Sequence, residues 1–432
     1  MVNSVMCFRK STDALVETWR SVPGIDESPT PAFRRRPIRP STYIDLTWGQ
    51  QLQLTRRLVP RTLGLGGRPF KSSPTVSGRM FLIQLQRTQD ITRAHDSMRK
   101  SLLDRLCCPE CRSPLLLEEG NGDGESIDTG KLVCKACHGE WLILRGIPRF
   151  VPPDEYTNSF GEQWKHFKRE QLDSHTKTDL SELRFYDVTR WSKGELRGEW
   201  ILDAGCGAGR FAEIAAAAGA NVVAVDLSAA VDACQDNLGN RFPETLHIVQ
   251  ADLYKLPFRQ ASFDRAYSIG VAQHTPKPLE AVRAVSKMVR GGGKLALWIY
   301  ELTWKSFIGF SAWKYSLRPI TRHLGFRTNY VLALVFCSIL WPVWFPLVYL
   351  GKVGRVILAF FPITAHPYAG KRLRPKDCFR CVVLDTVDMY SPAYDKPQRF
   401  GPVSKVLEEE GYTGLVRTCT SLGLHATRTQ PR

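Results

Sequence analysis

Acidic residues are scarce in this chain relative to basic ones. Its 432 residues include 42 Asp and Glu against 59 Lys and Arg, which leaves a formal net charge of +17 at pH 7. Such an excess favours contact with polyanions or with an anionic membrane surface. Hydrophobic residues, at 43%, and aromatic residues, at 10%, are not scarce, so global disorder is excluded. The length predicts two or three domains.

A secretory signal is not recognisable ahead of the twelve cysteines. We therefore expect a reducing compartment, the cytoplasm, where cysteines bind metal more often than they form structural disulfides. Residues 1–97 also lack a periodic pattern, and their basic residues outnumber the acidic ones. We expect a disordered basic extension there, or an upstream stretch ahead of a protein that begins at Met98.

The stretch 201–210 lacks the features of two common phosphate-binding loops. It reads ILDAGCGAGR, so that Gly205, Gly207 and Gly209 stand at alternate positions after Asp203. This spacing differs from G-x-G-x-x-G, and no Lys-Ser/Thr pair follows to hold phosphate and magnesium, which argues against a nucleoside triphosphate. Apolar residues before the loop and the alanine-rich segment after it predict strand, turn and helix, the start of a βαβ unit.

Acidic residues end three successive predicted strands. Asp203 ends the first, Asp226 follows the strand at 221–225, and Asp252 follows a third strand. Further strands are predicted at 263–269 and 294–300. A carboxylate before the loop suits a cationic ligand, and one at the end of the second strand can accept both ribose hydroxyls. The fold class that follows is α/β, with a Rossmann-like sheet.

These motifs resemble the class I S-adenosylmethionine-dependent methyltransferases, above all their UbiE-like type 11 group. The resemblance rests on ILDAGCGAGRF, VVAVDLS, IVQADLYKLPF, SFDRAYSIGVAQHTPKP and MVRGGGKLALWIY, between about residues 200 and 300. It implies that Asp203 holds the methionine amino group of the cofactor, Asp226 the ribose, and Asp252 with Leu253 the adenine. The cofactor-binding set that we expect is Asp203, Gly205, Gly207, Gly209, Asp226, Leu227, Asp252, Leu253, Ile269 and Gln273.

His274 is the candidate catalytic residue. It follows the fourth strand, at the sheet edge where open α/β folds bind ligands, and an imidazole can accept a proton near neutral pH. Methyl transfer often needs no base, because the sulfonium is already activated and alignment is the enzyme's main contribution. Two roles are therefore open for His274, general base or part of the cofactor pocket.

Two matched cysteine pairs precede the methyltransferase motifs. Cys108 and Cys111 form one C-x2-C pair, and Cys134 and Cys137 form the other, with 22 residues between them. This spacing is typical of a structural zinc site with four thiolate ligands. Together with the Gly-Ile-Pro turn at 146–148, the segment resembles the Trm112-like zinc ribbon found ahead of some methyltransferases. We expect the zinc mainly to let a small module fold.

A long insertion follows the fifth strand. Its segment 330–350, YVLALVFCSILWPVWFPLVYL, contains no charge over 21 residues, which is long enough for a membrane span. Its two prolines are expected to kink it, and Trp341, Trp344 and Tyr349 are residue types favoured at membrane interfaces. A membrane span, an interfacial hairpin and a buried lid over an apolar substrate all fit this pattern.

These patterns divide the chain into six parts. They are a basic extension at 1–97, a zinc ribbon at 98–152, a linker with cofactor-capping helices at 153–198, the methyltransferase core at 199–300, the apolar helical insertion at 301–402, and a C-terminal helix and β-hairpin at 403–432. The capping role is assigned to the aromatic segment 156–164. The C-terminal part has its helix predicted at 403–411 and its strands at 414–418 and 422–427.

The methyl acceptor is open between three functions. A small apolar acceptor, such as a quinone, lipid or aromatic intermediate, fits the insertion and the UbiE-like resemblance, with Tyr390 and Tyr394 as candidate substrate-orienting residues. An rRNA or tRNA base fits the ribbon and the positive charge. A cofactor-binding scaffold without catalysis is the third. The expected partners are a lipophilic small molecule, a membrane surface in contact with 330–350 and, less favoured, RNA. No pattern indicates an oligomer.

Overall fold

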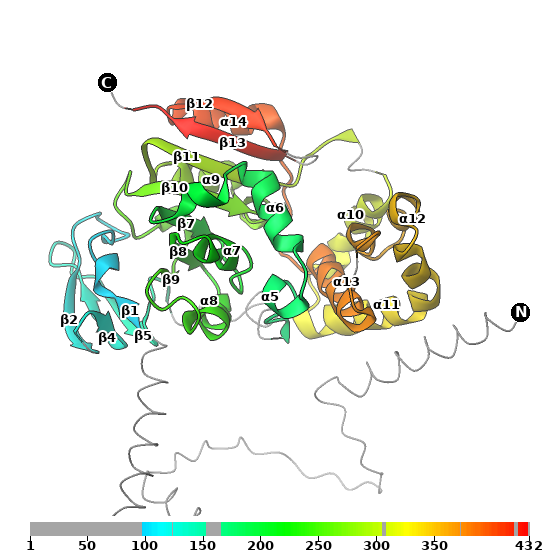
Figure 1. The fold of residues 1–432 in the computed structure, drawn as a ribbon, viewed down its shortest axis with the longest axis horizontal. Helices are drawn as coiled ribbons and strands as arrows, with labels where there is room; N and C mark the ends of the chain where they lie inside the picture. The colour runs from blue at the N-terminus through cyan, green and yellow to red at the C-terminus, as the bar shows by residue number, and fades with distance from the viewer. Residues whose placement is uncertain are drawn as a thin grey trace, which may run out of the picture. The chain divides into compact units, whose positions relative to one another are not determined.

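The computed structural model describes residues 97–122, 124–152, 166–304, 308–371, 373–418 and 422–430. The predicted extension, apart from residue 97, and the predicted capping segment 156–164 lie outside these ranges. Figure 1 shows a small strand-rich module, a larger sheet with helices on its faces, and a group of helices coloured yellow to orange. The six-part division of the chain stays a prediction.

The larger sheet has seven strands in the order β12-β13-β11-β10-β7-β8-β9. All neighbours among β7 to β11 pair in parallel, and β13 pairs antiparallel with both β11 and β12. The strands are β7 (Trp200–Ala204), β8 (Asn221–Asp226), β9 (Leu246–Gln250), β10 (Phe263–Ile269), β11 (Val289–Ile299), β12 (Tyr412–Arg417) and β13 (Leu422–Arg428). The predicted α/β class with a Rossmann-like sheet is therefore confirmed.

Helices connect or precede these strands. They are α5 (Asp173–Thr176), α6 (Leu180–Thr189), α7 (Ala212–Ala217), α8 (Ala230–Cys234), α9 (Pro278–Ser286) and α14 (Phe400–Glu409). The last helix begins earlier than predicted, at Phe400.

β11 also begins earlier than predicted and runs through three glycines, 291–293. Its pairing with β10 shifts register between Phe263 and Arg265, so the strand bulges there. At Gly293 a β-carbon would lie 2.4 Å from the Asp264 carbonyl oxygen, which only glycine avoids.

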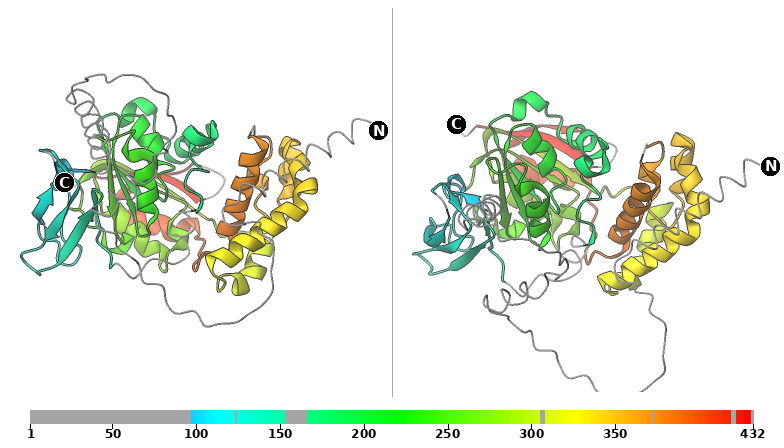
Figure 2. Two further views of the ribbon diagram at one scale, coloured as in Figure 1. Left: turned by 90° about the horizontal axis from the view of Figure 1, so that it is seen from below. Right: turned by 60° about the horizontal axis from the view of Figure 1, so that its bottom comes forward.

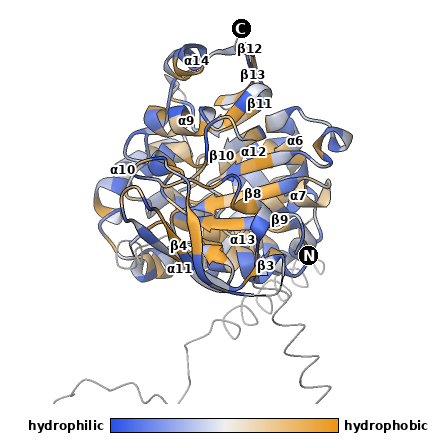
Figure 3. Ribbon diagram, turned by 90° about the vertical axis from the view of Figure 1, so that its left-hand side faces the viewer, coloured by the Kyte–Doolittle hydropathy of each residue, from blue (hydrophilic) through white to orange (hydrophobic). Residues whose placement is uncertain are grey.

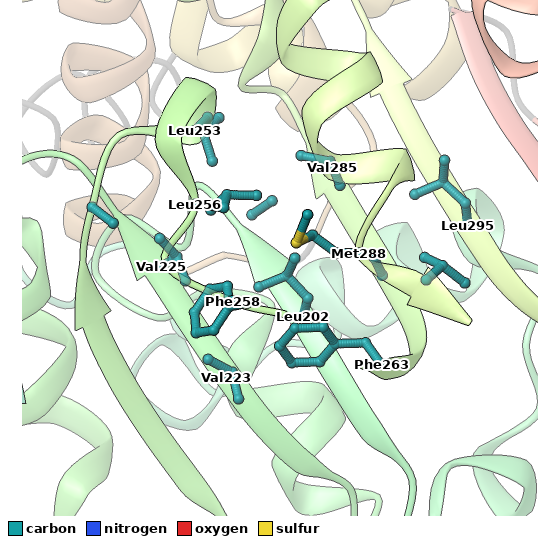
Figure 4. Close-up of a cluster of buried hydrophobic side chains, with 14 of the residues drawn as sticks. Leu202, Val223, Val225, Leu253, Leu256, Phe258, Phe263, Val285, Met288 and Leu295 are labelled. Atoms are coloured by element: carbon teal, nitrogen blue, oxygen red, sulfur yellow. The ribbon is translucent and has the colours of Figure 1, made fainter. Parts of the chain in front are cut away.

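Both faces of the sheet are buried. Along β8, Val223 and Val225 belong to one hydrophobic cluster, and Val222 and Ala224 belong to another on the opposite face. Figure 4 shows the first cluster, in which Leu202, Phe258 and other side chains gather over the strands. In Figure 3 the strands around β8 are coloured as hydrophobic. Continuous apolar strands of this kind are typical of a parallel sheet covered on both sides.

The small module is an antiparallel sheet of order β2-β4-β5-β6 with a separate β1–β3 pair. The strands are β1 (Met98–Arg99), β2 (Leu116–Asn121), β3 (Ser126–Ile127), β4 (Thr129–Val133), β5 (Glu140–Leu144) and β6 (Ile147–Pro148). Its buried residues Leu106, Leu132 and Ile143 belong to the same hydrophobic cluster as one face of the large sheet. The module and the sheet therefore share a core.

The insertion forms helices with a hydrophobic cluster of their own. They are α10 (Phe310–Thr321), α11 (Phe326–Val348), α12 (Gly351–Leu358) and α13 (Pro375–Tyr390), grouped together in both views of Figure 2. α11 continues through Pro342 and Pro346. Trp341 and Trp344, expected at a membrane interface, are instead 3% and 0% exposed, because they pack against Phe379 of α13.

Candidate functional site

The glycine loop after β7 adopts backbone conformations that side chains disfavour. Gly205 and Gly209 have φ of +92° and +95°, and Gly207 has φ of +53°. A β-carbon on Gly205 would lie 2.4 Å from Val271 Cγ1, and one on Gly209 would lie 2.6 Å from Leu238 Cδ1. The loop therefore needs glycine for its turn and for its close packing against Val271 and Leu238.

Asp226 closes this loop from the end of β8. Its Oδ2 accepts a hydrogen bond from Gly207 N at 2.9 Å, and its Oδ1 accepts from Ser228 N at 2.9 Å and Ser228 Oγ at 2.7 Å. Burial raises the pKa of Asp226, against the opposing effect of these hydrogen bonds. Leu227 follows, and its carbonyl accepts from Gln250 Nε2 at 3.0 Å. The carboxylate is thus fixed in place beside the loop.

Asp203 is buried at the end of β7. It is 2% exposed, and within the described ranges its Oδ2 has no hydrogen-bond partner. Burial raises its pKa to about 8; the nearby Asp226 adds to the shift, and Tyr267 on the adjacent strand β10 opposes it. A buried carboxyl oxygen without a partner is costly, and a cationic ligand would satisfy the charge and the missing hydrogen bond.

Gln273 lies at the end of β10, beyond Ile269. It is fully buried, and neither atom of its amide group has a partner in the part of the chain that the structure describes. Its backbone carbonyl accepts from Lys396 N at 2.8 Å, which fixes the residue. Ile269 is 8% exposed. A buried amide without partners is costly and is the pattern expected of a polar ligand site.

Asp252 and Leu253 follow β9, as predicted. Asp252 caps the short 3-10 helix Leu253–Lys255, because its side chain accepts from Tyr254 N at 2.9 Å. Leu253 is 7% exposed and belongs to the core below the sheet edge. The three acidic residues therefore lie at the same end of the neighbouring strands β7, β8 and β9.

His274 ends the 3-10 helix Ala272–His274. Its Nδ1 lies 3.1 Å from the Tyr394 carbonyl oxygen, so in the neutral ring Nδ1 carries the proton and donates it there. The ring packs edge-on against Tyr300 at 5.4 Å. Burial lowers the pKa of His274 to about 4; Lys314 and Arg318 lower it further, and Asp395 opposes them. The imidazole is therefore neutral at physiological pH and a weak base.

The two predicted substrate tyrosines lie in different settings. The Tyr390 hydroxyl donates to the Pro362 carbonyl at 2.9 Å, so this residue makes a hydrogen bond within the insertion. Tyr394 is 43% exposed, with the Lys396 ammonium 5.6 Å from its ring centroid, and its carbonyl contacts His274. Only Tyr394 is thus brought to His274.

Sequence patterns missed an ion pair at this place. Lys314 Nζ lies 2.6 Å from Asp395 Oδ2, and the two side chains are 8% and 0% exposed. The ammonium also lies 4.6 Å from the Tyr300 ring centroid. Arg318, one turn further along α10, donates to the carbonyls of Met389 at 3.3 Å and Pro392 at 2.7 Å. Two cations four residues apart in an apolar insertion were the available signal.

Polar interactions also link the residue after the glycine loop to α6 and α13. Arg210, directly after Gly209, donates from Nε to Ser181 Oγ at 3.0 Å, at the start of α6. Asp385 of α13 accepts from Tyr368 Oη at 2.7 Å, and burial raises its pKa, opposed by Arg210 among other groups. The loop thus lies close to α6 and α13.

The four predicted zinc ligands converge. The sulfur atoms of Cys108, Cys111, Cys134 and Cys137 all lie within 4.8 Å of one another, with pairs at 3.5 Å and 3.4 Å. Zn–S bonds of about 2.3 Å in a tetrahedron place sulfur atoms about 3.8 Å apart, so the arrangement fits structural zinc.

The knuckle next to Cys108 also touches the core. Cys107 N donates to the Pro257 carbonyl at 2.8 Å, and Arg112 Nη1 donates to the Leu256 carbonyl at 2.6 Å. These carbonyls belong to the segment that follows Asp252 and Leu253. The metal module therefore braces the chain next to the predicted adenine site.

Known families match both modules. Residues 202–297 match the family described as "Methyltransferase domain", and residues 99–141 match "Trm112p-like protein". The O-methyltransferase cnsE of Penicillium expansum is 34% identical over 104 residues, 23% of this chain and 38% of that protein. Sterol 24-C-methyltransferase ERG6 of Saccharomyces cerevisiae is 28% identical over 160 residues, 35% of this chain and 40% of that protein.

This chain thus spans 38% and 40% of the length of these two curated relatives. Among solved structures, magnesium protoporphyrin IX methyltransferase from Synechocystis PCC 6803, with bound SAH, is 17% identical with a TM-score of 0.33, covering 64% of this chain and 97% of that chain. At that TM-score the likeness decides nothing further. The glycine loop, the acidic strand ends, the cysteine cluster and the two family matches together identify a class I methyltransferase domain preceded by a Trm112-like module.

Proposed function

We propose that this chain transfers a methyl group from S-adenosylmethionine to a small apolar acceptor. The observation that carries the proposal is the set of acidic residues at the ends of the adjacent strands β7, β8 and β9, one of which, Asp203, is buried with an unpaired oxygen. The buried and unpaired amide of Gln273 supports the same ligand site. These polar groups favour cofactor binding, which a methyltransferase and a cofactor-binding scaffold both require, so the transfer of the methyl group is what separates the two functions.

Each residue takes part in the proposed site through its position. Asp203 would bind the ammonium group of the cofactor, Asp226 the ribose hydroxyls, and Asp252 with Leu253 the adenine. The glycine loop, with Leu227, Ile269 and Gln273, would line the rest. The cofactor supplies a methyl group already activated on a sulfonium. The protein's part is therefore to align the acceptor with that methyl group and to exclude water.

His274 serves in this proposal as a positioning residue. Because its pKa is lowered to about 4, its Nε2 can accept a hydrogen bond from an acceptor hydroxyl but holds a transferred proton poorly. Its Nδ1 is engaged with the Tyr394 carbonyl, which fixes the direction of the ring. Tyr394 would thus act on the acceptor through His274, and Tyr390 through the packing of the insertion.

An apolar acceptor is favoured by the insertion and by the names of the relatives. Those names include a sterol 24-C-methyltransferase and ubiquinone biosynthesis O-methyltransferases. Lys314 of α10 pairs with Asp395, and both residues influence the pKa of His274, so the insertion comes close to this residue. A base in RNA is the less favoured acceptor, and the ribbon is assigned to bracing the core instead.

Calorimetry with S-adenosylmethionine tests the cofactor site. The wild type is expected to bind and Asp226→Ala to lose binding at least tenfold, since a ribose contact and the fixed loop are both lost. Asp187→Ala is the matched control, because this aspartate pairs at the surface with Arg190, 3.0 Å away. Equal affinity of wild type and Asp226→Ala would refute the site.

Methyl-label transfer tests the acceptor. The protein and labelled cofactor are incubated with lipid, RNA and protein fractions of the source cell, and with Asp226→Ala as the inactive control. Label is expected in the lipid-soluble fraction. Label in RNA alone would replace the apolar acceptor with the RNA function, and binding of cofactor without transfer to any fraction would favour the scaffold.

A further inference from the structure

α11 has two apolar faces, and only one of them is covered. The inner face packs on α13, with Cys337, Trp341 and Trp344 buried. The outer face carries large apolar side chains on successive turns, among them Phe336 at 50% and Ile339 at 71% exposure. A surface helix normally presents polar residues to water, and one that is apolar all round needs a second apolar environment.

α12 also exposes an apolar face. Val353, Val356, Ile357 and Phe360 follow the spacing i, i+3, i+4, i+7, so they share one face of this short helix and its end, and all four are exposed. Gly354 and Leu358 on the other face are buried. The helix therefore turns its apolar stripe away from the protein.

α10 adds a third apolar face next to α12. Trp313, Leu317 and Ile320 are exposed, and Trp313 Nε1 donates to the Phe360 carbonyl at 3.0 Å, which joins the two helices. On its opposite side α10 buries Lys314 and Arg318. The exposed apolar residues of α10, α11 and α12 are called the outer surface below.

The outer surface is not the wall of a membrane-spanning hairpin. α11 is long and apolar enough to cross a membrane by length and composition, with 33% of its most apolar window buried. It is packed along α13, however, through Cys337 with Thr386 and Trp341 with Phe379. α13 carries Asp377, Arg380, Asp385 and Asp388. Charges of both signs would have to enter the lipid core with α11, which is prohibitively costly.

The positive charge of the insertion indicates that an anionic surface covers its exposed apolar residues. Between Glu301 and Asp377 the sequence contains no Asp or Glu at all, and it contains eleven Lys and Arg. Arg322 and Arg327 are exposed ahead of the apolar part of α11, and Lys352 and Arg355 are exposed after its end. Basic residues at both ends of an outward apolar face match the anionic headgroups around an acyl layer.

We propose that the outer surface docks into one leaflet of an anionic membrane, with α11 lying in the plane of the bilayer and not across it. Its apolar side chains enter the acyl boundary, and the basic residues at its ends contact lipid phosphates. α10 then lies between the bilayer and the buried Lys314–Asp395 pair. This docking does not depend on the proposed methyl transfer.

Vesicle sedimentation of the full chain tests the proposal. One vesicle preparation is phosphatidylcholine alone, and the other contains phosphatidylglycerol at about a third of the lipid. We expect the protein to pellet with the anionic vesicles and to bind neutral ones at least tenfold more weakly. Ile339→Glu with Val356→Glu should lower binding at least tenfold, and Lys352→Glu with Arg355→Glu should lower it on anionic vesicles, on a scale of about fivefold per basic residue.

Val416→Glu is the matched control, because Val416 of β12 is a similarly exposed valine, at 54%, outside the outer surface. It should bind vesicles like the wild type. All variants should keep wild-type affinity for S-adenosylmethionine in calorimetry, which separates a failure of docking from a failure of the cofactor site or of folding.

Four results would overturn the proposal. The first is a wild type that stays in the supernatant with anionic vesicles. The second is equal binding of the wild type to neutral and anionic vesicles. The third is unchanged vesicle binding of the variant Ile339→Glu with Val356→Glu. The fourth is bound protein that resists alkaline carbonate extraction, which would indicate a span. Light scattering measures the oligomeric state and so tests a second copy of this chain as the occupant. A wild-type dimer that does not bind lipid, and that Ile339→Glu converts to a monomer, would make the outer surface an interface between copies of this chain.

Discussion

Arg149 of the zinc module and Asp232 of α8 form a two-pronged ion pair. Arg149 Nη2 lies 2.7 Å from Asp232 Oδ1, Nη1 lies 3.3 Å from Oδ2, and Nη1 also donates to Gln250 Oε1 at 2.7 Å. Gln250 in turn donates to the Leu227 carbonyl, next to Asp226. The zinc module is therefore linked by hydrogen bonds to the strand end where we place the ribose.

Replacing Arg149 with Met should weaken both the fold and the cofactor site. The side chain is 18% exposed, and its loss leaves Gln250 with an unpaired acceptor. We expect the free energy of unfolding to fall by about 1–3 kcal/mol, with a several-fold weaker affinity for S-adenosylmethionine. Urea unfolding and calorimetry measure the two effects.

Lys131→Met is the control for this change. Lys131 pairs with Glu140 at 3.4 Å on the exposed side of the same module, so its loss should cost less than about 1 kcal/mol and leave the cofactor affinity unchanged. Equal losses in the two variants would contradict a specific role for Arg149.

Zinc should be present at one ion per chain and should stabilise the whole domain. Cys134→Ser removes one of four converging ligands, and the module shares its hydrophobic core with the sheet. We therefore expect metal analysis to find the zinc lost and the melting temperature lowered. Cys107→Ser is the control, since Cys107 is outside the four-cysteine group and contacts the core through its backbone. Retention of zinc by Cys134→Ser would refute the site.

Local patterns were enough to predict the sheet and the metal site. Apolar runs that are each followed by an acidic residue, such as Asp226, predict the strands and their ends. The spacing of the cysteines alone predicts the four-cysteine cluster. The insertion was different. In 330–350 every residue is uncharged, so no periodicity tells an inner face from an outer one. Trp341 faces inward only because Phe379 of α13, far along the chain, packs against it.

The polar groups near His274 were beyond prediction for the same reason. Lys314 and Asp395 are separated by a long stretch of sequence, and nothing local indicates that they pair. The pKa of His274 depends on both of them and on burial, so its weak basicity could not be derived from the sequence. Long-range contacts set these properties.

Asp203→Asn should abolish cofactor binding and at the same time stabilise the free protein above neutral pH. The folded pKa of Asp203, about 8, is higher than its ordinary value of 3.8. The native state therefore keeps a proton that the unfolded state releases between about pH 4 and 8, and this carboxyl makes the protein less stable as pH rises through that window. Asparagine has no proton to lose.

Two measurements check this prediction. The difference in melting temperature between Asp203→Asn and wild type, without cofactor, should grow from pH 5 to pH 8 in favour of the variant. Calorimetry of wild type in buffers of different ionisation enthalpy should show proton release on cofactor binding near pH 7, since an ammonium group favours the ionised carboxylate. A pH-independent stability difference would mean that Asp203 is already ionised.

His274→Asn should lower the rate of methyl transfer by less than about tenfold, because a positioning role needs a side chain that donates to the Tyr394 carbonyl and asparagine offers one. The acceptor is the one that the labelling experiment identifies.

Since the pKa of His274 is about 4, its ring is neutral throughout the range from pH 6 to 9, and its titration should leave no limb in the rate profile there. His274→Ala, which removes the donor, should lose more activity than His274→Asn. A wild-type limb near pH 6.5 that disappears in His274→Asn, with a loss above about a hundredfold, would instead make His274 a general base whose pKa rises when the acceptor binds.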